Sequence, residues 1–423
     1  MKILLLGSGG REHAIAVKLK NSKYTKELYI APGNAGTANE GTNIALNPTD
    51  FEEIRTFVLK QGVNMVVVGP EEPLVKGIAN FFLSLPELAN IPVIGPSAEG
   101  AKLEGSKQFA KEFMIKYKIP TAQYLTVTAK NVGEGIDFLN NIKKPYVLKA
   151  DGLAAGKGVI ITSDLEEAID TLQKMLDGMF GKAGNSVVIE EFLDGIEVSY
   201  FVLTDGNEYV LLPEAKDYKR IGDGDTGPNT GGMGAVSPVP FCNKEFSDKV
   251  IKQVIEPTIR GLKTEHINYK GFVFIGLMNV NGEPFVIEYN CRLGDPETEV
   301  IIPRIENDLV ELFNAVHQQS LRQQIIKTNE KTAVTVVVAS KGYPNDYSKG
   351  ETIDNLDSIT DSIVYHAGTK KENLKTVSNG GRVLAITSIG IDIEEARNKS
   401  YKSIDKIGWE SKTYRKDIGN DLK

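Results

Sequence analysis

The first hundred residues alternate short apolar runs with helical patterns, and this alternation limits the fold more than any other feature of the sequence. The runs KILLLGS, ELYIAPG, VNMVVVGPE and IPVIGPS all contain glycine or proline near their ends, and segments such as REHAIAVKLK and DFEEIRTFVLKQ separate them. Strands that alternate with helices form a parallel sheet covered by helices on both faces. Ligands of such sheets bind beyond the carboxyl ends of the strands. The loops GSGGREH, APGNAGT, GPEEPL and GPSAEG follow those ends, so we expect them to share one binding site.

The first of these loops is similar to a dinucleotide-binding turn but departs from it. Gly7 and Gly9 fit two positions of the dinucleotide fingerprint, whereas Glu12 stands where a small residue allows close helix–strand packing. No acid lies within residues 30–38 to bind a ribose hydroxyl. A helix N-terminus still attracts anions through its free N–H groups and its dipole, and Arg11 adds a cation. The loop therefore favours a phosphate site over a dehydrogenase, with a tight turn before a solvated helix start as the simpler alternative.

Length, charge and cysteine usage set the broad class. A chain of 423 residues is too long for one core and predicts about three domains. The net charge of −7 argues against broad binding to nucleic acid or to a membrane surface. Cys242 and Cys291 lie far apart without metal-ligand spacing, which is typical of plain thiols in a reducing compartment. The apolar runs are too short for a signal peptide or a membrane span, so we expect a soluble, cytoplasmic protein.

The rest of the chain divides into three stretches. Residues 121–192 carry the strands PYVLKA, VIITS and SVVIEEFL and the helix LEEAIDTLQKMLDGM. Residues 195–320 carry EVSYFVLTDG, YVLLPEAKDYK, GFVFIGLMNV and EPFVIEYN, a mainly antiparallel stretch followed by a helix that begins near Asn307. Within it, RIGDGDTGPNTGGMGAVSPVP is dense in Gly, Asp and Pro and predicts a long loop that is functional or disordered. After residues 328–331, TAVTVVVAS, SIVYHAG and RVLAITS predict a β-rich domain.

The segment YVLKADGLAAGKGV looks like a phosphate-binding P-loop but does not fit one. Gly152 and Gly156 enclose three residues where the Walker pattern needs four, and Gly158 follows Lys157 where Ser or Thr would bind magnesium. Lys149 at the strand end remains, followed by a glycine- and alanine-rich hairpin. Such a hairpin can close over a triphosphate with its backbone N–H groups, or it is a flexible surface hairpin.

The segment VVIEEFLDGIEVS has the composition of an adenine-binding link. A buried strand leads into Glu190 and Glu191, then into the apolar pair Phe192 and Leu193, and Glu197 follows. Backbone groups of the link can bind an adenine edge, and Glu197 can accept from ribose hydroxyls. Taken alone, the segment is better explained as a strand that ends in solvated acids.

The segment FVIEYNCRLGDPETE carries the strongest chemical signal. Strand alternation puts Val286, Glu288 and Asn290 on one face, opposite Tyr289. A carboxylate and an amide oxygen are hard ligands suited to Mg²⁺ held between protein and nucleotide phosphates. Arg292 continues that face and offers a planar fork to a carboxylate or a phosphate. So many polar groups at the end of one apolar strand indicate a functional site.

The motifs LLLGSGGREHA, GPEEPL, GPSAEGAKLEGSK, KADGLAAGKGV, EEFLDGIEVS, DYKRIGDGDTGPNTGGMGA and EYNCRLGDPETE, in this order, resemble the ATP-grasp ligases. More narrowly, GSGGREH, DTGPNTGGMG and NCRLGDPE resemble the glycinamide ribonucleotide synthetase (phosphoribosylamine–glycine ligase) family. The resemblance implies a multidomain α/β and α+β fold. Its parts are a Rossmann-like N-terminal parallel-sheet domain (1–102), a central ATP-grasp lobe (103–120 and 193–327), a small lid lobe (121–192) and a C-terminal β-rich domain (328–423).

The resemblance also implies the reaction and its ligands. ATP is the co-substrate, Mg²⁺ or Mn²⁺ the metal, and glycine and 5-phosphoribosylamine the substrates of an ATP-dependent C–N ligation through glycyl phosphate, the second step of purine biosynthesis. No nucleic acid or membrane takes part, and the protein is expected to be a monomer, with a weak dimer as the alternative. The strand GFVFIGLMNV has no acid where many ATP-grasp proteins supply a further metal ligand.

Residue roles carry over position by position. ATP contacts are assigned to Lys107, Lys149, Gly156, Gly158, Glu190, Glu191, Phe192, Leu193, Glu197 and Lys219. Contacts to the other substrates are assigned to Gly9, Gly10, Arg11, Glu12, His13, Asn34, Gly36, Glu71, Asp217 and Arg292. Metal binding is assigned to Glu288 and Asn290, and catalysis to Arg292, Lys149 and Asp217. We expect Arg11 to serve phosphoribosylamine and Arg292 to serve glycine, and residues 151–158 and 221–234 to be the most mobile segments.

Three alternatives stay open on the sequence. The chain could be another ATP-grasp carboxylate–amine ligase, or a carboxylase of the purine or biotin type, which glycine-dependent ADP formation would decide. It could be an inactive nucleotide-binding regulator, although such a protein should lack lysines or metal ligands that are present here. A dehydrogenase would bind NADH.

Overall fold

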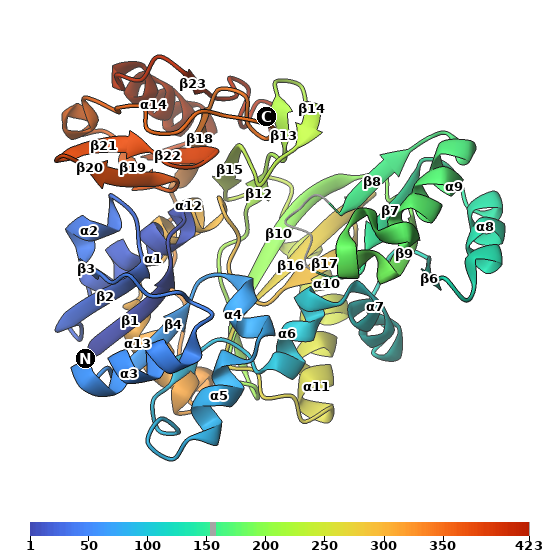
Figure 1. Cartoon of the computed structure of the whole chain (residues 1–423), viewed down its shortest axis with the longest axis horizontal. Coiled ribbons are helices and arrows are strands. Elements are labelled where there is room, and N and C mark those ends of the chain that lie inside the picture. Colours follow the sequence, from blue (N-terminus) through green and yellow to red (C-terminus); the bar gives the residue numbers. More distant parts are fainter. Residues whose placement is uncertain (153–157, 423) are drawn as a thin grey trace.

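The computed structural model describes residues 1–152 and 158–422, and it confirms a mixed α/β fold built from several sheets. In Figure 1 the N-terminal sheet lies beside a central sheet, the C-terminal sheet lies above both, and a small lobe projects to one side. None of the described helices combines the length and the apolar composition needed to cross a bilayer.

The N-terminal domain contains the expected parallel sheet, in the order β3-β2-β1-β4-β5. Its strands are β1 (Lys2–Gly7), β2 (Glu27–Pro32), β3 (Thr42–Asn43), β4 (Met65–Val68) and β5 (Val93–Ile94). The helices are α1 (Gly10–Lys20), α2 (Thr37–Glu40), α3 (Phe51–Gln61), α4 (Glu71–Val75), α5 (Ile78–Ser84) and α6 (Ala98–Gly105). The four predicted strands and the two predicted helices are confirmed, and β3 is an addition.

Both faces of this sheet are buried, as continuous apolar strands require. Leu4 and Leu6 join the core that includes Ile54 and Val58 of α3, whereas the alternate β1 residues Ile3 and Leu5 join a core formed with α1 and α13 (Leu309–His317). The Asp50 side chain caps α3 by accepting from Glu53 N at 3.0 Å, and Gly62 ends it in the left-handed region at φ 65°.

The small lobe is an antiparallel sheet in the order β6-β9-β7-β8 with its own apolar core. It comprises β6 (Tyr124–Thr128), α8 (Val132–Asn141), β7 (Tyr146–Ala150), β8 (Val159–Thr162), α9 (Leu165–Lys174), η1 (Met175–Met179), η2 (Gly181–Asn185) and β9 (Ser186–Glu191). The predicted strands and the predicted helix are confirmed. Most of the glycine-rich hairpin, including Gly156, lies outside the described residues.

The central sheet runs β11-β10-β16-β17 and is antiparallel. Its strands are β10 (Ile196–Thr204), β11 (Tyr209–Leu211), β16 (Gly271–Val280) and β17 (Glu283–Asn290), with α7 (Lys107–Lys116), α10 (Lys244–Val250), η3 (Ile251–Ile255) and α11 (Glu256–Thr264) in the same part of the fold. The helix expected near Asn307 is α13, and α12 (Thr298–Ile301) and η4 (Ile302–Arg304) precede it.

The simple alternation predicted for β17 is wrong. The register with β16 shifts between Gly276 and Leu277, so that Gly276 opposes Glu288 and Leu277 opposes Val286. An extra residue in one strand re-aims the side chains beyond it. Val286 therefore packs in the same apolar core as Tyr289, whereas Glu288 and Asn290 still share the opposite face.

The C-terminal sheet has the order β12-β15-β18-β22-β19, with β23 paired to β18. Its strands are β12 (Lys216–Asp217), β15 (Gly234–Ser237), β18 (Thr332–Ser340), β19 (Ile363–His366), β22 (Arg382–Gly390) and β23 (Lys412–Thr413), and α14 (Ile393–Lys406) packs on it. The hairpin of β20 (Thr369–Glu372) and β21 (Lys375–Ser378), together with η6 (Leu356–Ser358), completes this part, whereas η5 (Leu321–Gln323) follows α13 and contacts β11 of the central sheet. The three predicted strands are confirmed.

The prediction of a long structureless loop at 220–240 is wrong. Residues Arg220–Gly222 and Thr226–Asn229 form the hairpin β13–β14, and Gly234–Ser237 pairs with β18 as β15. The predicted strand YVLLPEAKDYK is also divided, because β11 ends before Pro213 and β12 joins the C-terminal sheet. Two strands from the middle of the chain thus extend the C-terminal sheet toward the site.

Candidate active site

A cavity with a volume of about 500 Å³ is lined by the N-terminal domain, the small lobe, the central sheet and Arg382 of β22. The predicted residues that line it are Arg11, Glu71, Lys149, Glu190, Glu191, Phe192, Leu193, Glu197, Asp217, Lys219, Glu288, Asn290 and Arg292. A neighbouring cavity of about 200 Å³ shares several of them and adds Lys107 and Gly158. The fold therefore gathers most of the predicted residues at one place.

Lys149 belongs to a buried chain of charges. Its Nζ lies 2.9 Å from Glu190 Oε1, and Lys111 Nζ lies 3.0 Å from Glu190 Oε2. Lys111 also donates to Thr121 Oγ1 at 2.8 Å. Burial lowers the pKa of Lys111 to about 8, although Glu190 opposes this shift. The single carboxylate of Glu190 thus positions two ammonium groups beside the cavities, and the three groups together keep a net positive charge.

Lys107 begins α7 at the smaller cavity. The Ser106 side chain caps this helix by accepting from Phe109 N at 3.1 Å, and the Asp151 carboxylate accepts from Gln108 N at 3.2 Å. Lys107 Nζ donates to the carbonyl of Gly152 at 3.1 Å. Burial lowers the pKa of Lys107 and Lys149 adds to this shift, while Glu288 opposes it. Two lysines and a helix N-terminus make this end of the site attractive to phosphate.

Lys219 lies among the acids Glu197, Asp217 and Glu288 at the wall of the larger cavity. Lys219 Nζ donates to Glu197 Oε2 at 2.7 Å. Desolvation opposes its charge, but Glu197, Asp217 and Glu288 hold the pKa of Lys219 well above its usual value. Burial and the neighbouring Glu197 raise the pKa of Asp217, although Lys219 opposes the rise.

Glu288 and Asn290 meet the chemical requirements of a metal site shared with phosphate. Burial opposes ionisation of Glu288, but Lys219, Lys149 and other nearby cations hold its pKa below the usual value. Asn290 has a buried side-chain nitrogen without a hydrogen-bond partner among the described residues, so its amide is not committed to the protein. No group of three or more His, Cys, Asp or Glu side chains in the described chain is arranged as a metal cage. A divalent ion bound here would also need oxygen ligands from phosphate and water, as Mg²⁺ usually has in nucleotide sites.

Arg292 bridges two domains at the cavity wall. Its Nη2 lies 2.8 Å from Glu104 Oε1, and its Nε donates to Glu71 Oε2 at 3.3 Å. Glu104 also accepts from the backbone N of Cys291 at 2.8 Å. Burial raises the pKa of Glu104, and Arg292 opposes that rise. These partners fix the guanidinium plane, and the cavity-facing side remains available to an anion.

Arg11, from the first glycine loop, lies beside Arg292 at the wall of the larger cavity. Arg11 Nη1 and Arg292 Nη1 donate to the carbonyl of Leu293, at 3.0 Å and 3.2 Å. Arg11 Nε also donates to Glu12 Oε1 at 2.6 Å, and Gly9 N donates to Glu12 Oε2 at 2.6 Å. The two arginines, expected to serve different substrates, are therefore neighbours, and Glu12 caps its own helix rather than lining either cavity.

Several predicted substrate residues instead join the N-terminal and C-terminal domains. His13 Nδ1 accepts from His366 N at 2.7 Å, and Asn34 Nδ2 donates to the carbonyl of His366 at 2.7 Å. A Cβ on Gly36 would lie 2.3 Å from the His13 ring, and one on Gly10 would lie 2.2 Å from a Glu299 oxygen. The side chains of His13 and Asn34 are engaged in this contact, so their predicted roles toward substrate rest on neighbouring backbone groups.

Several residues that line the two cavities were not predicted from the sequence, among them Lys111, Glu297 and Arg382. Lys111 follows Lys107 by one helical turn, a spacing that could have indicated it. Glu297 lines the cavity and accepts from Ser199 Oγ at 3.1 Å, and burial together with Asp217 raises its pKa to about 7. Arg382 donates to the carbonyl of Asp295 at 2.6 Å and pairs with Asp295 Oδ1 at 2.9 Å. No local pattern marks Arg382, because it comes from the C-terminal domain.

An antiparallel lobe over a second antiparallel sheet, with lysines and hard ligands between them, defines the class of the ATP-grasp enzymes. Three family models divide almost the whole chain: phosphoribosylglycinamide synthetase N domain over residues 1–104, ATP-grasp (A) domain over 105–298 and C domain over 333–421. The chain belongs to the phosphoribosylglycinamide synthetase family, which confirms the family predicted from the motifs.

Relatives match along the full length. A phosphoribosylamine–glycine ligase of Vibrio cholerae is 44% identical over 425 residues, which cover 99% of this chain and 98% of the relative. The crystal structure of a phosphoribosylamine–glycine ligase from Thermotoga maritima has a TM-score of 0.86 at 38% identity, covering 99% of this chain and all of that one. The biotin carboxylase domain of Hydrogenobacter thermophilus 2-oxoglutarate carboxylase has a TM-score of 0.73 at 18% identity, covering 98% of this chain and 91% of that one, and shows a similar fold.

Proposed function

We propose that the protein joins glycine to 5-phosphoribosylamine with ATP as co-substrate, giving glycinamide ribonucleotide, ADP and phosphate. The observation that supports this most strongly is the meeting of Lys149, Glu288, Arg292 and Arg11 in one cavity. Lys149 is a cation that can neutralise phosphate, Glu288 is a metal ligand, and the two arginine guanidinium groups can bind anions. These are the groups needed to activate a carboxylate with ATP beside a phosphorylated amine. This is the second step of purine biosynthesis, and the free thiols of the chain fit a reducing cytoplasm.

The reaction has two steps. A carboxylate oxygen of glycine attacks the γ-phosphorus of ATP, the bond to ADP breaks, and glycyl phosphate forms. The amine nitrogen of phosphoribosylamine then attacks the acyl carbon, the bond to phosphate breaks, and the nitrogen loses a proton. Both steps need positioning and charge neutralisation more than a protein nucleophile.

The residues divide these tasks. Lys107 and Lys149 neutralise the phosphates, and Arg292 holds the glycine carboxylate. Mg²⁺ or Mn²⁺ would be held by Glu288 and Asn290 and would neutralise further phosphate charge.

The remaining assignments follow the charges of the cavity wall. Asp217, with Glu297 beside it, forms an acidic wall suited to the glycine ammonium group. The segment Glu190–Leu193 receives adenine, and Glu197 with Lys219 receives the ribose. The backbone N–H of Gly158 is assigned to the phosphates, and Gly156 is likewise assigned to ATP.

Phosphoribosylamine is assigned to the first loops of the N-terminal domain. Arg11 offers its guanidinium to the 5-phosphate, and the backbone of Gly9, Gly10 and Gly36 lines the approach. Glu71 faces the cavity from α4 and fixes Arg292. Glu12, His13 and Asn34 shape these loops from within.

A coupled ADP-release assay tests the proposal, with each substrate omitted in turn. ADP should form only when ATP, glycine and freshly made phosphoribosylamine are all present, and mass spectrometry should find glycinamide ribonucleotide. ADP formation that ignores glycine, or that depends on bicarbonate, would instead support a carboxylase.

A further inference from the structure

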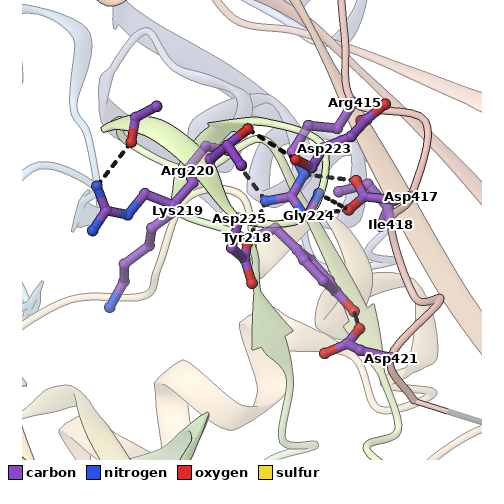
Figure 2. Close-up of polar contacts among 12 residues, drawn as sticks. Tyr218, Lys219, Arg220, Asp223, Gly224, Asp225, Arg415, Asp417, Ile418 and Asp421 are labelled. Carbon is purple, nitrogen blue, oxygen red and sulfur yellow. Dashed lines mark hydrogen bonds and ion pairs between the residues drawn. The ribbon is translucent and has the colours of Figure 1, made fainter.

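The C-terminal segment 415–421 holds the β13–β14 hairpin through a network of charges (Figure 2). Arg415 Nη1 donates to Asp225 Oδ1 at 2.6 Å and to the carbonyl of Arg220 at 3.2 Å. Asp417 accepts from Arg415 Nε and Nη2 at 2.8 and 2.7 Å and also from Gly224 N at 2.7 Å. The side chain of Arg415 is only 1% exposed and that of Asp417 is 21% exposed, whereas its other partner, Asp225, is 61% exposed, so the guanidinium is buried beneath an exposed hairpin tip.

The hairpin depends on these outside contacts for its position. Residues 223–229 are exposed, and β13 and β14 form a sheet of two strands with an irregular register. An isolated two-stranded hairpin is marginal in water. The exposed tip is tied to the C-terminal segment by Arg415, by Asp417 and by the bond from Lys416 N to Asp223 Oδ1 at 2.8 Å.

Both ends of the hairpin reach the larger cavity. Lys219 precedes β13, Thr230 follows β14, and both line the cavity. Thr230 closes the hairpin base, because its N and Oγ1 donate to the carbonyl of Lys219 at 2.8 and 2.7 Å. Figure 2 shows the Lys219 side chain directed away from the Arg415 cluster, and its Nζ meets Glu197 at 2.7 Å. The buried network and the cavity wall thus lie on opposite sides of one short ribbon.

We propose that Arg415 is a positioning residue for ATP: it fixes the hairpin so that Lys219 stays paired with Glu197 at the nucleotide end of the cavity. Arg415 does not line either of these two cavities. It acts through the hairpin and through Tyr218, whose ring centroid lies 5.1 Å from the guanidinium carbon. The inference rests on one part of the proposed function, namely the assignment of Lys219 and Glu197 to ATP. It implies that nucleotide exchange does not require the hairpin to open.

The test compares three variants by hydrogen exchange, by ADP calorimetry and by steady-state kinetics. Arg415→Gln removes the guanidinium bonds to Asp225, to Asp417 and to the carbonyl of Arg220. Asp225→Asn removes the charge of one hairpin partner at an exposed position, in case the first variant does not fold. Lys416→Ala is the matched control, because its exposed side chain has no hydrogen bond or ion pair among the described residues while its backbone bond to Asp223 remains.

Arg415→Gln should speed exchange of the amides at 220–229 and weaken ADP about tenfold, the usual effect of losing charge-assisted bonds. The KM for ATP should rise by a similar factor, with the KM for phosphoribosylamine nearly unchanged. Asp225→Asn should show the same pattern more weakly, and Lys416→Ala should match the wild type. Unchanged exchange at 220–229, or equal rises in both KM values, would overturn the inference. ADP affinity is measured without ligation, so a wild type that binds ADP but makes no product would refute the proposed function alone.

Discussion

Replacing Lys149 with methionine should nearly abolish turnover while leaving the fold intact. Removing one partner of a buried pair commonly costs about 3–5 kcal/mol because a charge is left alone. Glu190, however, keeps Lys111 at 3.0 Å, so the loss of stability should be smaller. Removing one preorganised charge partner of a transition state costs about 2.7–4 kcal/mol, and kcat should therefore fall roughly 10²–10³-fold.

The assay is ADP release at saturating substrates, with the melting temperature measured beside it. Lys143→Met is the matched control, because Lys143 is an exposed lysine of the same lobe and should keep full activity. A folded Lys149→Met protein with near-normal turnover would refute the assignment of Lys149 to the transferring phosphoryl group.

Three further predictions concern the metal, the substrates and pH. Glu288→Ala and Asn290→Ala should both raise the Mg²⁺ concentration that gives half-maximal activity, since each removes one oxygen ligand. If that concentration is unchanged in both variants, the metal binds elsewhere. Arg11→Ala should raise the KM for phosphoribosylamine about ten- to hundredfold, the loss of a charge-assisted phosphate contact worth about 1.5–3 kcal/mol, whereas Arg292→Ala should act on glycine or on kcat. If Arg11→Ala changed only the glycine KM, the two placements would be wrong. The pKa of Lys111 falls from 10.5 to about 8 on folding, so the unfolded chain binds more protons between these values and stability should rise with pH there. Melting temperatures should show this rise relative to Lys111→Met, and parallel pH curves would contradict it.

The sequence predicts the elements whose signals are local. The four main strands of the N-terminal sheet are apolar runs that end near glycine or proline, and Lys149, Glu288 and Arg292 are ionisable residues at the ends of apolar strands, which is a local signal of a functional site. Parallel strands then bring the loops to one edge of the sheet, so the position of Arg11 near the site also follows from the pattern.

The parts that the sequence does not predict depend on partners far along the chain. The shift opposite Gly276 changes which core Val286 joins, and a single strand carries no sign of its neighbour's register. The Gly- and Asp-rich segment looks structureless by composition, yet Arg415 orders it from about 190 residues away, as judged from its contact with Asp225. Glu12 was predicted to contact substrate, but its carboxylate caps α1 by accepting from Gly9 N.

Isotope transfer can show whether glycine is activated as an acyl phosphate before the amine attacks. Glycine carrying oxygen-18 in its carboxylate is ligated in unlabelled water, and the inorganic phosphate is analysed by mass spectrometry. Because the phosphate leaves with one carboxylate oxygen, each phosphate released should carry one labelled oxygen, and the amide product should carry the other. Unlabelled phosphate formed alongside glycinamide ribonucleotide would show that the glycine carboxylate is not phosphorylated.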